Sequence, residues 1–188
     1  MEKSFEKILT DCRAIFEKKL RDYGPTWLIF RWISLVDQIF IKLSRLRALE
    51  ESGGERRVAD TPRDEYYGVI NYCLVGLMKD ESMLPPPEEI LRNPAVLDNL
   101  PLDAILARYD AATARALSLM EQKNHDYGAA WQGMAVTSIT DQMLVKVLRM
   151  KHILTSNRTL PAADSLPAQL MDILNYCLFA LMLSKAGI

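Results

Sequence analysis

Most of this 188-residue chain is one segment that occurs twice. Residues 17–78 align with residues 121–182 at a constant offset of 104 positions, without a gap, and about 20 of the 62 aligned positions are identical. Internal duplication on this scale predicts a fold built from two like units. Each unit is too small to bury a large core by itself, so we expect the two units to pack against each other as one body.

Apolar spacing and turn residues predict three helices in each unit and no strand. Prolines at positions 85–87, 94 and 101 lie between the units and predict an irregular linker. The expected fold is all-α: two duplicated three-helix units form a six-helix bundle with pseudo-two-fold symmetry, and the second and third helices of each unit lie at its centre. The expected segments are repeat one at 1–80, the linker at 81–102 and repeat two at 103–188. Helices are expected from Ser4 to Gly24, Ser34 to Glu50, Thr61 to Asp80, Asp103 to His125, Ser138 to Thr155 and from Ser165 onward, and the expected N-caps are Ser4, Asp103, Ser138 and Ser165.

The composition argues against several classes of function. A net charge of −1 offers no basic surface for nucleic acid or for an anionic membrane. We expect no signal peptide in the charged N-terminal region, and no apolar run long enough to span a bilayer. The three cysteines form no CxxC motif, which favours small reduced core residues and a cytoplasmic setting. A homodimer of the whole chain is a candidate assembly.

The second helix of each unit carries an identical polar face opposite an apolar face that varies. Helical spacing places the Asp, Gln, Lys and Arg of SxxDQxxxKxxR on or beside one side of the helix. Core positions tolerate exchange of apolar residues, whereas a solvated face has little reason to keep four polar residues unchanged. The face is either a buried ion-pair network or a pocket for a phosphate-bearing ligand. Its charged residues are Asp37, Lys42 and Arg45 in repeat one and Asp141, Lys146 and Arg149 in repeat two.

The third helix of repeat two carries a carboxylate and an amide within an apolar sequence. Asp172 and Asn175 are three residues apart, so they lie on one face of this helix. A buried carboxylate needs a partner, which either a divalent cation or the two cations of the second helix would supply. Repeat one keeps the amide as Asn71 but has glycine at the position of the aspartate, and Asp64 or Glu65, about one turn earlier, is the candidate replacement. Repeat two is therefore the favoured site.

The motif DYGxxW occurs at the end of the first helix in both units. In one interpretation the glycine ends the helix and the two aromatic residues anchor the turn on the bundle. In the other, the aromatic faces form the wall of a nucleobase site, and nearby polar side chains contact the ligand. The residues concerned are Tyr23 and Trp27 in repeat one and Lys123, Asp126, Tyr127 and Trp131 in repeat two.

Three segments, KNHDYGAAW, SITDQMLVKVLRM and MDILNYCLFALM, together resemble the bacterial and phage family named nucleotide modification associated domain 1. The resemblance covers nearly all of each repeat, and it implies a setting in nucleotide or DNA-base modification more than a particular reaction. A weaker similarity links the chain to the all-α nucleoside triphosphate pyrophosphohydrolases, the MazG and dimeric dUTPase group. That similarity implies Mg²⁺ held against substrate phosphates, with Asp172 and Asn175 where that group has ExxD and with Asp141 alone representing ExxE.

The leading hypothesis is a nucleotide-binding protein linked to nucleotide or DNA-base modification, with Mg²⁺-dependent hydrolysis of a nucleoside triphosphate as its possible reaction. The alternative is a non-catalytic helical interaction or scaffold module, in which the repeated polar faces form a structural salt-bridge network. The first hypothesis assigns catalysis and the metal to Asp141 and Asp172, and ligand binding to Lys123, Asp126, Tyr127, Trp131, Lys146, Arg149 and Asn175, with Tyr23, Trp27, Asp37, Lys42, Arg45 and Asn71 as the repeat-one equivalents.

Overall fold

The computed structural model describes residues 2–79, 84–156 and 165–184. This part of the chain is helical and contains no strand, which confirms the predicted all-α fold. Repeat one contributes α1 (Glu2–Tyr23), the short 3₁₀ helix η1 (Thr26–Ile29), α2 (Trp32–Glu51) and α3 (Pro62–Lys79). Repeat two contributes α5 (Leu102–Tyr127), the 3₁₀ helix η3 (Ala130–Gly133), α6 (Val136–Thr155) and α7 (Leu166–Leu183).

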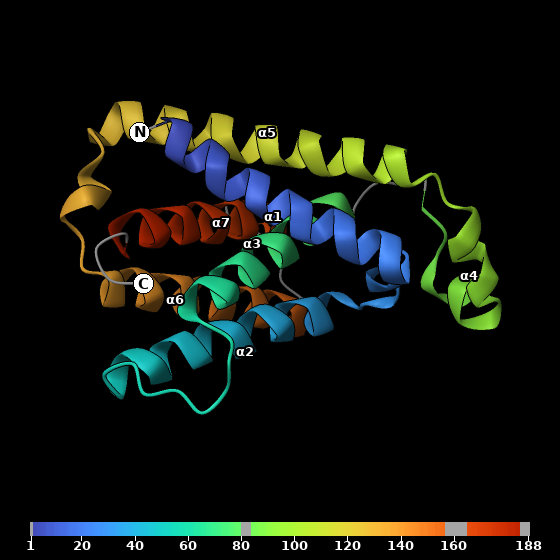
Figure 1. Ribbon diagram of the computed structural model, residues 1–188, viewed down its shortest axis with the longest axis horizontal. Coiled ribbons are helices and arrows are strands. Elements are labelled where there is room, and N and C mark those ends of the chain that lie inside the picture. Colours follow the sequence, from blue (N-terminus) through green and yellow to red (C-terminus); the bar gives the residue numbers. More distant parts are fainter. Residues whose placement is uncertain (1, 80–83, 157–164, 185–188) are drawn as a thin grey trace.

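The long helices form three layers, with α3 and α7 in the middle (Figure 1). α1 and α5 cover one side of this pair, and α2 and α6 cover the other. α3 packs against α7, and α2 packs against α6, so each contact joins equivalent helices of the two repeats. The apolar stripes of α2 and α6, which include Leu35, Ile39 and Val147, are fully buried. The second and third helices therefore form the centre of the bundle, as the duplication predicts.

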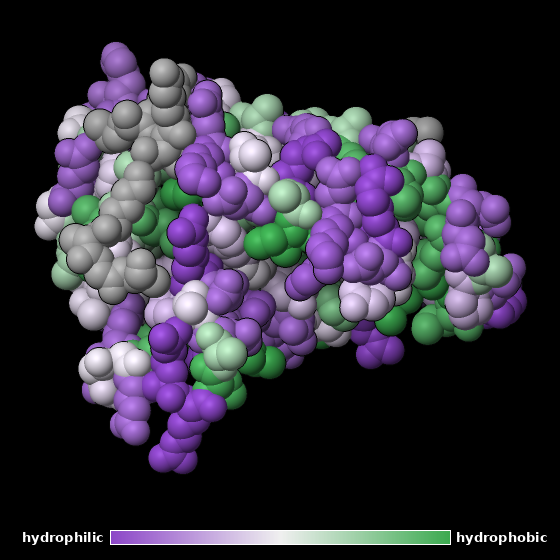
Figure 2. All heavy atoms as spheres, in the orientation of Figure 1, coloured by the Kyte–Doolittle hydropathy of each residue, from purple (hydrophilic) through white to green (hydrophobic). Residues whose placement is uncertain are grey.

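The surface and the interior differ as expected for a packed bundle. Hydrophilic residues cover much of the face seen in Figure 2, and hydrophobic residues appear there in small patches between them. On α3, by contrast, Tyr66, Ile70, Leu74 and Met78 are almost completely buried. This burial holds α3 rigidly between its neighbours and fixes the side of the helix that faces α1.

By length and composition alone, α7 is apolar enough to cross a membrane, contrary to the expectation that no apolar run is long enough. Its contacts are those of a core helix, because Leu170, Ile173 and Leu174 are fully buried between the neighbouring helices. Cys73 of α3 and Cys177 of α7 are free, fully buried thiols, and burial raises the pKa of each. The prediction that these two cysteines are core residues is confirmed.

Two reciprocal ion pairs join α2 to α6. Lys151 Nζ lies 2.7 Å from Asp37 Oδ1, and Arg47 Nη1 lies 3.4 Å from Asp141 Oδ1. Arg47 and Lys151 occupy equivalent positions of the two repeats, as do the two aspartates, so the pairs are symmetry-related. Because all four side chains are partly exposed, each pair contributes little to stability. This contact between repeats explains why the aspartate is identical in both.

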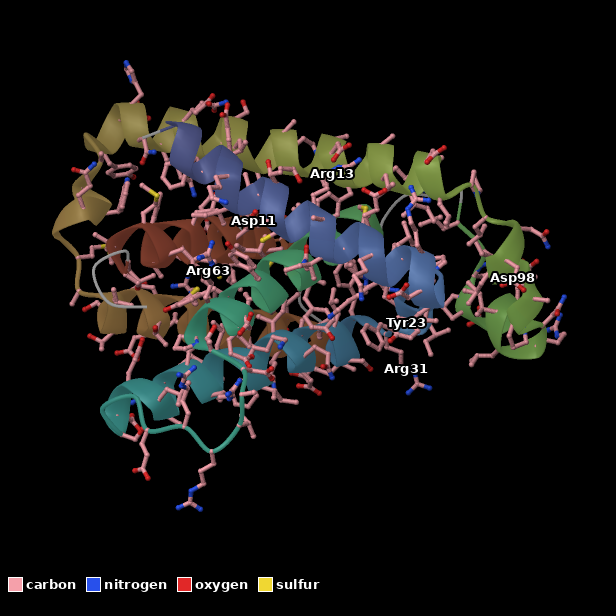
Figure 3. All side chains as sticks on the ribbon, in the orientation of Figure 1. Asp11, Arg13, Tyr23, Arg31, Arg63 and Asp98 are labelled. Carbon is pink, nitrogen blue, oxygen red and sulfur yellow. The ribbon has the colours of Figure 1, made fainter. Side chains whose placement is uncertain are left out.

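Polar contacts hold α1 to its neighbours (Figure 3). Arg13 Nε donates to Asp110 Oδ1 of α5 at 2.7 Å, and Arg63 Nη2 of α3 donates to Asp11 Oδ2 at 3.3 Å. The guanidinium of Arg63 also lies over the ring of Tyr67, 5.1 Å from its centroid. α1, whose end carries the first DYGxxW motif, is thereby held against α3 and α5.

α2 and α6 begin two residues earlier than predicted, at Trp32 and Val136. Ser34, the predicted start of its helix, and Ser138, the predicted cap, instead lie inside the first turn of each helix. Trp32 and Val136 pack against the hydrophobic core, and this packing favours extension of each helix back toward the preceding turn. Tertiary contacts thus override the capping preference of serine at both positions.

The segment between the repeats is not the irregular linker that its prolines predict. It forms α4 (Pro87–Arg92) and the 3₁₀ helix η2 (Pro94–Asn99), and each begins with a proline. Proline is tolerated at this position because the first N–H groups of a helix make no hydrogen bond within the helix. α4 packs against η1. Asp103 lies in the first turn of α5 and is not its cap, whereas Ser165 caps α7 as predicted.

Candidate functional site

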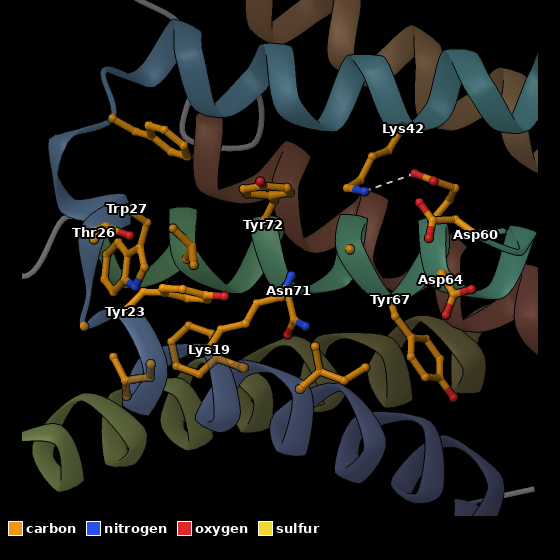
Figure 4. Close-up of a pocket in the computed structure, with 18 of the residues that line it drawn as sticks. Lys19, Tyr23, Thr26, Trp27, Lys42, Asp60, Asp64, Tyr67, Asn71 and Tyr72 are labelled. Carbon is orange, nitrogen blue, oxygen red and sulfur yellow. Dashed lines mark hydrogen bonds and ion pairs between the residues drawn. The ribbon is translucent and has the colours of Figure 1, made fainter. Parts of the chain in front are cut away.

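A cavity of about 590 Å³ lies in repeat one, between the end of α1, η1, α2 and α3 (Figure 4). Tyr23 and Trp27 lie toward one end of it, Tyr72 lies near its middle, and Asp60 and Asp64 lie toward the other end. The volume is within the range of about 300–1,000 Å³ that is typical of small-molecule sites. Other lining residues include Lys19, Lys42, Glu65, Gly68, Asn71 and Val75.

The DYGxxW turn shapes the aromatic end of the cavity. Gly24 has a φ of +66°, the left-handed conformation that commonly ends a helix. Tyr23 therefore lies on the last turn of α1 and Trp27 on η1, and both line the cavity. Tyr23 is 71 % exposed, whereas Trp27 is half-buried. The turn thus presents one accessible aromatic ring and one partly enclosed ring to the same space.

A buried carboxylate neutralises the polar face of α2. Lys42 Nζ donates to Glu65 Oε2 at 3.0 Å, and Arg45 Nη1 donates to Glu65 Oε1. Arg45 Nη2 also donates to the carbonyl oxygen of Asp60 at 2.8 Å. Glu65 is only 4 % exposed, and the two cations compensate for its desolvation. Glu65, one of the two replacements predicted for Asp172, is therefore the partner of the α2 cations in repeat one.

Gly68 allows the side chain of Lys42 to lie across α3. A Cβ atom at this position would be 2.6 Å from Lys42 Cε and 2.9 Å from Lys42 Nζ, closer than non-bonded atoms approach. The glycine thus permits the path that Lys42 takes to Glu65 and leaves open space beside it. Among the residues that the structure describes, Lys19 lines this space without an ion-pair partner.

In repeat two the carboxylate lies one turn further along the third helix. Asp172, at the position of Gly68, accepts hydrogen bonds from Lys146 Nζ at 2.7 Å and from Lys123. Gln169 replaces the glutamate of repeat one. Burial raises the pKa of Asp172, but the hydrogen bonds and charges of the two lysines lower it by a larger amount. The pKa of Asp172 therefore lies below its usual range. Lysines therefore satisfy this carboxylate, where the sequence left a choice between a metal ion and the cations of the second helix.

This pKa predicts a pH-dependent stability that the Asp172→Asn variant lacks. Because the pKa is lower in the folded protein, ionised Asp172 stabilises the fold above its unfolded pKa of about 4. That contribution is lost as the pH falls below 4 through the folded pKa. Urea denaturation from pH 7 to pH 3 is expected to show the stability gap between wild type and variant narrowing below pH 4. A gap that is constant over this range would contradict the assignment.

Repeat two also fills the space that is open in repeat one. Trp131 is 7 % exposed and stacks on Phe179, with ring centroids 4.6 Å apart and ring planes 4° apart. The position equivalent to Phe179 is Val75, which lines the cavity. A valine side chain is too short to cover Trp27 as the phenyl ring covers Trp131. The two repeats therefore use the same tryptophan differently, in one as a cavity wall and in the other as a core residue.

The asparagine shared by the third helices has different surroundings in the two repeats. Asn71 Nδ2 donates to the Cys12 carbonyl at 3.2 Å, and Asn71 Oδ1 accepts from the Tyr109 hydroxyl at 2.7 Å. Asn175 is buried, and its side chain has no hydrogen-bond partner within the described residues. Phe5 occupies the position equivalent to Tyr109 and lacks the hydroxyl donor. Asn71 thus ties the wall of the cavity to α1 and α5.

The structure gives separate partners to the two carboxylates predicted to hold Mg²⁺. Asp141 pairs with Arg47 of α2, whereas Asp172 is held by Lys123 and Lys146. Within residues 2–79, 84–156 and 165–184, no group of three or more His, Cys, Asp or Glu side chains is arranged to hold a metal ion. A carboxylate between two lysines does not fit a Mg²⁺ site, because both ammonium groups repel the cation.

Most other residues predicted for repeat two lie at the surface. Asp126, Tyr127 and Arg149 are exposed, and Tyr127 is 74 % exposed. The sequence favoured repeat two for the ligand site, but the described cavity lies in repeat one. Around that cavity the structure brings together four of the repeat-one equivalents, Tyr23, Trp27, Lys42 and Asn71, whereas Asp37 and Arg45 contact other partners.

Sequence reasoning missed three residues that shape this cavity. Lys19 is identical in the alignment to Lys123, and that identity was a usable signal. Gly68 and Val75 differ from their equivalents in repeat two, and nothing in the sequence shows that these two differences lie beside one another in space. Their importance follows from the position of α3 opposite the DYGxxW turn.

Comparison with known proteins gives one result. Two segments of the chain, residues 19–79 and 123–183, match the family described as nucleotide modification associated domain 1, and together they cover more than half of the chain. No curated protein and no solved structure matches the chain significantly. The family match begins at Lys19 in one repeat and at Lys123 in the other, so each match includes this shared lysine. The chain therefore belongs to the nucleotide modification associated domain 1 family and carries two copies of its domain.

Proposed function

We propose that the cavity of repeat one binds a nucleotide, in the setting of nucleotide modification that the family name describes. One observation carries the proposal: a single cavity combines the aromatic side chains of Tyr23, Trp27 and Tyr72 with Lys19, which has no ion-pair partner among the described residues. Aromatic faces and a lysine suit the two chemically distinct parts of a nucleotide, its base and its phosphate. Membership of the family favours a nucleotide over other aromatic anions.

The aromatic end of the cavity suits a nucleobase. Stacking of a base on an aromatic side chain contributes about 1–3 kcal/mol, and Tyr23, Trp27 and Tyr72 supply rings from three different elements. The Tyr72 hydroxyl donates to Gln38 Oε1 at 3.4 Å, which helps to orient its ring. The indole N–H of Trp27 is buried without a hydrogen-bond partner in the described part of the chain.

Lys19 is the side chain that we assign to the phosphate. Lys42 also lines the cavity, but its charge is already compensated by Glu65. In repeat two the equivalent of Lys19 is Lys123, which is paired with Asp172. Because repeat one has glycine at the position of this aspartate, Lys19 is left available for an anionic ligand.

We propose that this cavity binds a nucleotide without metal-dependent hydrolysis of its phosphates. Glu65 is held by two cations, and Asp64 accepts hydrogen bonds from the N–H and hydroxyl of Thr61. Hydrolysis of a triphosphate through Mg²⁺ requires carboxylate oxygens that converge on the ion. The carboxylates lining this cavity are committed instead to ion pairs and to capping α3.

The Lys19→Ala variant tests this assignment. Loss of a charge-assisted contact to phosphate is expected to weaken nucleotide binding about 10- to 100-fold, measured by isothermal titration calorimetry with a panel of ribo- and deoxynucleotides. Lys123→Ala, the same change in repeat two, is the matched control and is expected to leave affinity unchanged. Equal losses in both variants, or none in Lys19→Ala, would show that the phosphate does not bind at Lys19.

A second candidate function is supported by the reciprocal ion pairs between α2 and α6. Asp37 with Lys151 and Asp141 with Arg47 explain one part of the identical polar faces by contact between repeats alone. These contacts favour a scaffold or interaction module in which the polar faces set helix register. If no nucleotide in the panel binds the wild-type chain, this module is the function that the contacts support.

A further inference from the structure

The cavity of repeat one has an uneven distribution of charge along its length. The aromatic rings of Tyr23 and Trp27 lie at one end, and Lys19 reaches in from α1 between that end and the carboxylates (Figure 4). Asp60 and Asp64 line the opposite end. A ligand whose base stacks at the aromatic end therefore has its phosphate near the lysine and any further groups pointing toward the two aspartates.

The carboxylate end is anionic at neutral pH. Hydrogen bonds from the hydroxyl and the backbone N–H of Thr61 hold the pKa of Asp64 below its usual range. Asp60 is exposed, and its carboxylate lies 3.9 Å from the guanidinium of Arg45. Arg45 is shared with buried Glu65, which also neutralises the ammonium group of Lys42. The charged side chains around this end therefore do not form a cationic surface for a phosphate chain.

We infer that the nucleotide taken by this cavity is a nucleoside monophosphate and not a triphosphate. This inference rests on the proposed function and specifies its ligand class. A single phosphate carries a charge of about −1.5 to −2 at pH 7, and one lysine offsets much of it. Each further phosphate adds negative charge and extends toward Asp60 and Asp64, where no unpaired cation lines the described cavity. Repulsion between like charges then outweighs the added attraction to Lys19.

Binding of a phosphate series to the wild-type chain tests this inference. Calorimetric titration is done with the 5′-mono-, di- and triphosphates of adenosine and of thymidine, at low salt and without metal ions. We expect the monophosphate of the preferred base to bind at least about tenfold more tightly than the triphosphate. A triphosphate that binds as tightly as the monophosphate, or more tightly, would overturn the inference and leave nucleotide binding itself intact. Absence of binding by every member of the series would overturn both.

The Asp60→Asn variant tests the physical cause. Removing this negative charge is expected to tighten triphosphate binding severalfold and to change monophosphate binding little, so that the ratio of the two affinities falls. Asp126→Asn, which removes an exposed carboxylate in repeat two, is the control and is expected to leave the ratio unchanged. A ratio that is the same in wild type and Asp60→Asn would show that this aspartate does not select the phosphate number.

Discussion

The Gly68→Asp variant is expected to lose nucleotide binding by at least about 100-fold, or roughly 2.7 kcal/mol. Any Cβ atom at this position displaces Lys42, whose Cε lies 2.6 Å from where that atom would be. An aspartate here reproduces the arrangement of repeat two, where Asp172 binds two lysines. The new carboxylate would therefore take Lys19 as its partner and place a negative charge where the ligand phosphate binds. Calorimetry measures the loss of affinity, and circular dichroism checks that the helical fold is retained.

Two controls separate charge from steric displacement in this experiment. Gly68→Ala also moves Lys42 but adds no carboxylate, so we expect it to weaken binding much less than Gly68→Asp. The reverse exchange, Asp172→Gly combined with Phe179→Val, copies both cavity-opening residues of repeat one into repeat two. We expect this double variant to bind a second nucleotide per chain. Full affinity in Gly68→Asp would remove the basis for placing the ligand phosphate at Lys19.

The Trp131→Ala variant is expected to destabilise the fold by about 3–5 kcal/mol, the usual cost of deleting a buried tryptophan. Trp131 is 7 % exposed, stacks on Phe179 and lies 6.0 Å from the ring of Phe5. Trp27→Ala removes the equivalent residue of repeat one, which is only half-buried beside the cavity. We expect a smaller loss of stability there and a loss of nucleotide binding. Urea denaturation measures the first effect, and calorimetric titration measures the second.

The contrast between the two tryptophans is the important result, because each variant serves as the control for the other. Trp131→Ala, studied under conditions where it remains folded, is expected to bind nucleotide at repeat one with unchanged affinity. If both variants lose the same stability and neither loses binding, the DYGxxW motif has a structural role in both repeats. That outcome would support the anchoring interpretation of the motif.

Duplication explains how the DYGxxW region can border a cavity in repeat one and be part of the packed interior in repeat two. The reciprocal packing of α2 on α6 and α3 on α7 needs both repeats, so neither can lose its core residues. The space under the DYGxxW turn is not part of this shared core. Repeat two fills it with Phe179 and an ion-paired Asp172, whereas repeat one leaves it open with Val75 and Gly68.

The amino-acid sequence alone predicts a duplicated, all-α fold with the second and third helices at its centre. These features depend on helical periodicity, which is a local property that can be read along the chain. It also offered Asp64 or Glu65 as the candidate replacement, in repeat one, for the aspartate of repeat two. The contact between Lys42 and Glu65 agrees with that reasoning.

Tertiary contacts are needed to explain why the cavity lies in repeat one and why Asp37 and Asp141 are identical. The cavity depends on the small side chains of Gly68 and Val75, and their size matters only because α3 faces the turn after α1. The two aspartates bind cations of the opposite repeat, across a helix contact that no periodicity specifies. The effect of a side chain's volume and charge depends on the side chains packed against it, and those neighbours come from segments distant in the sequence.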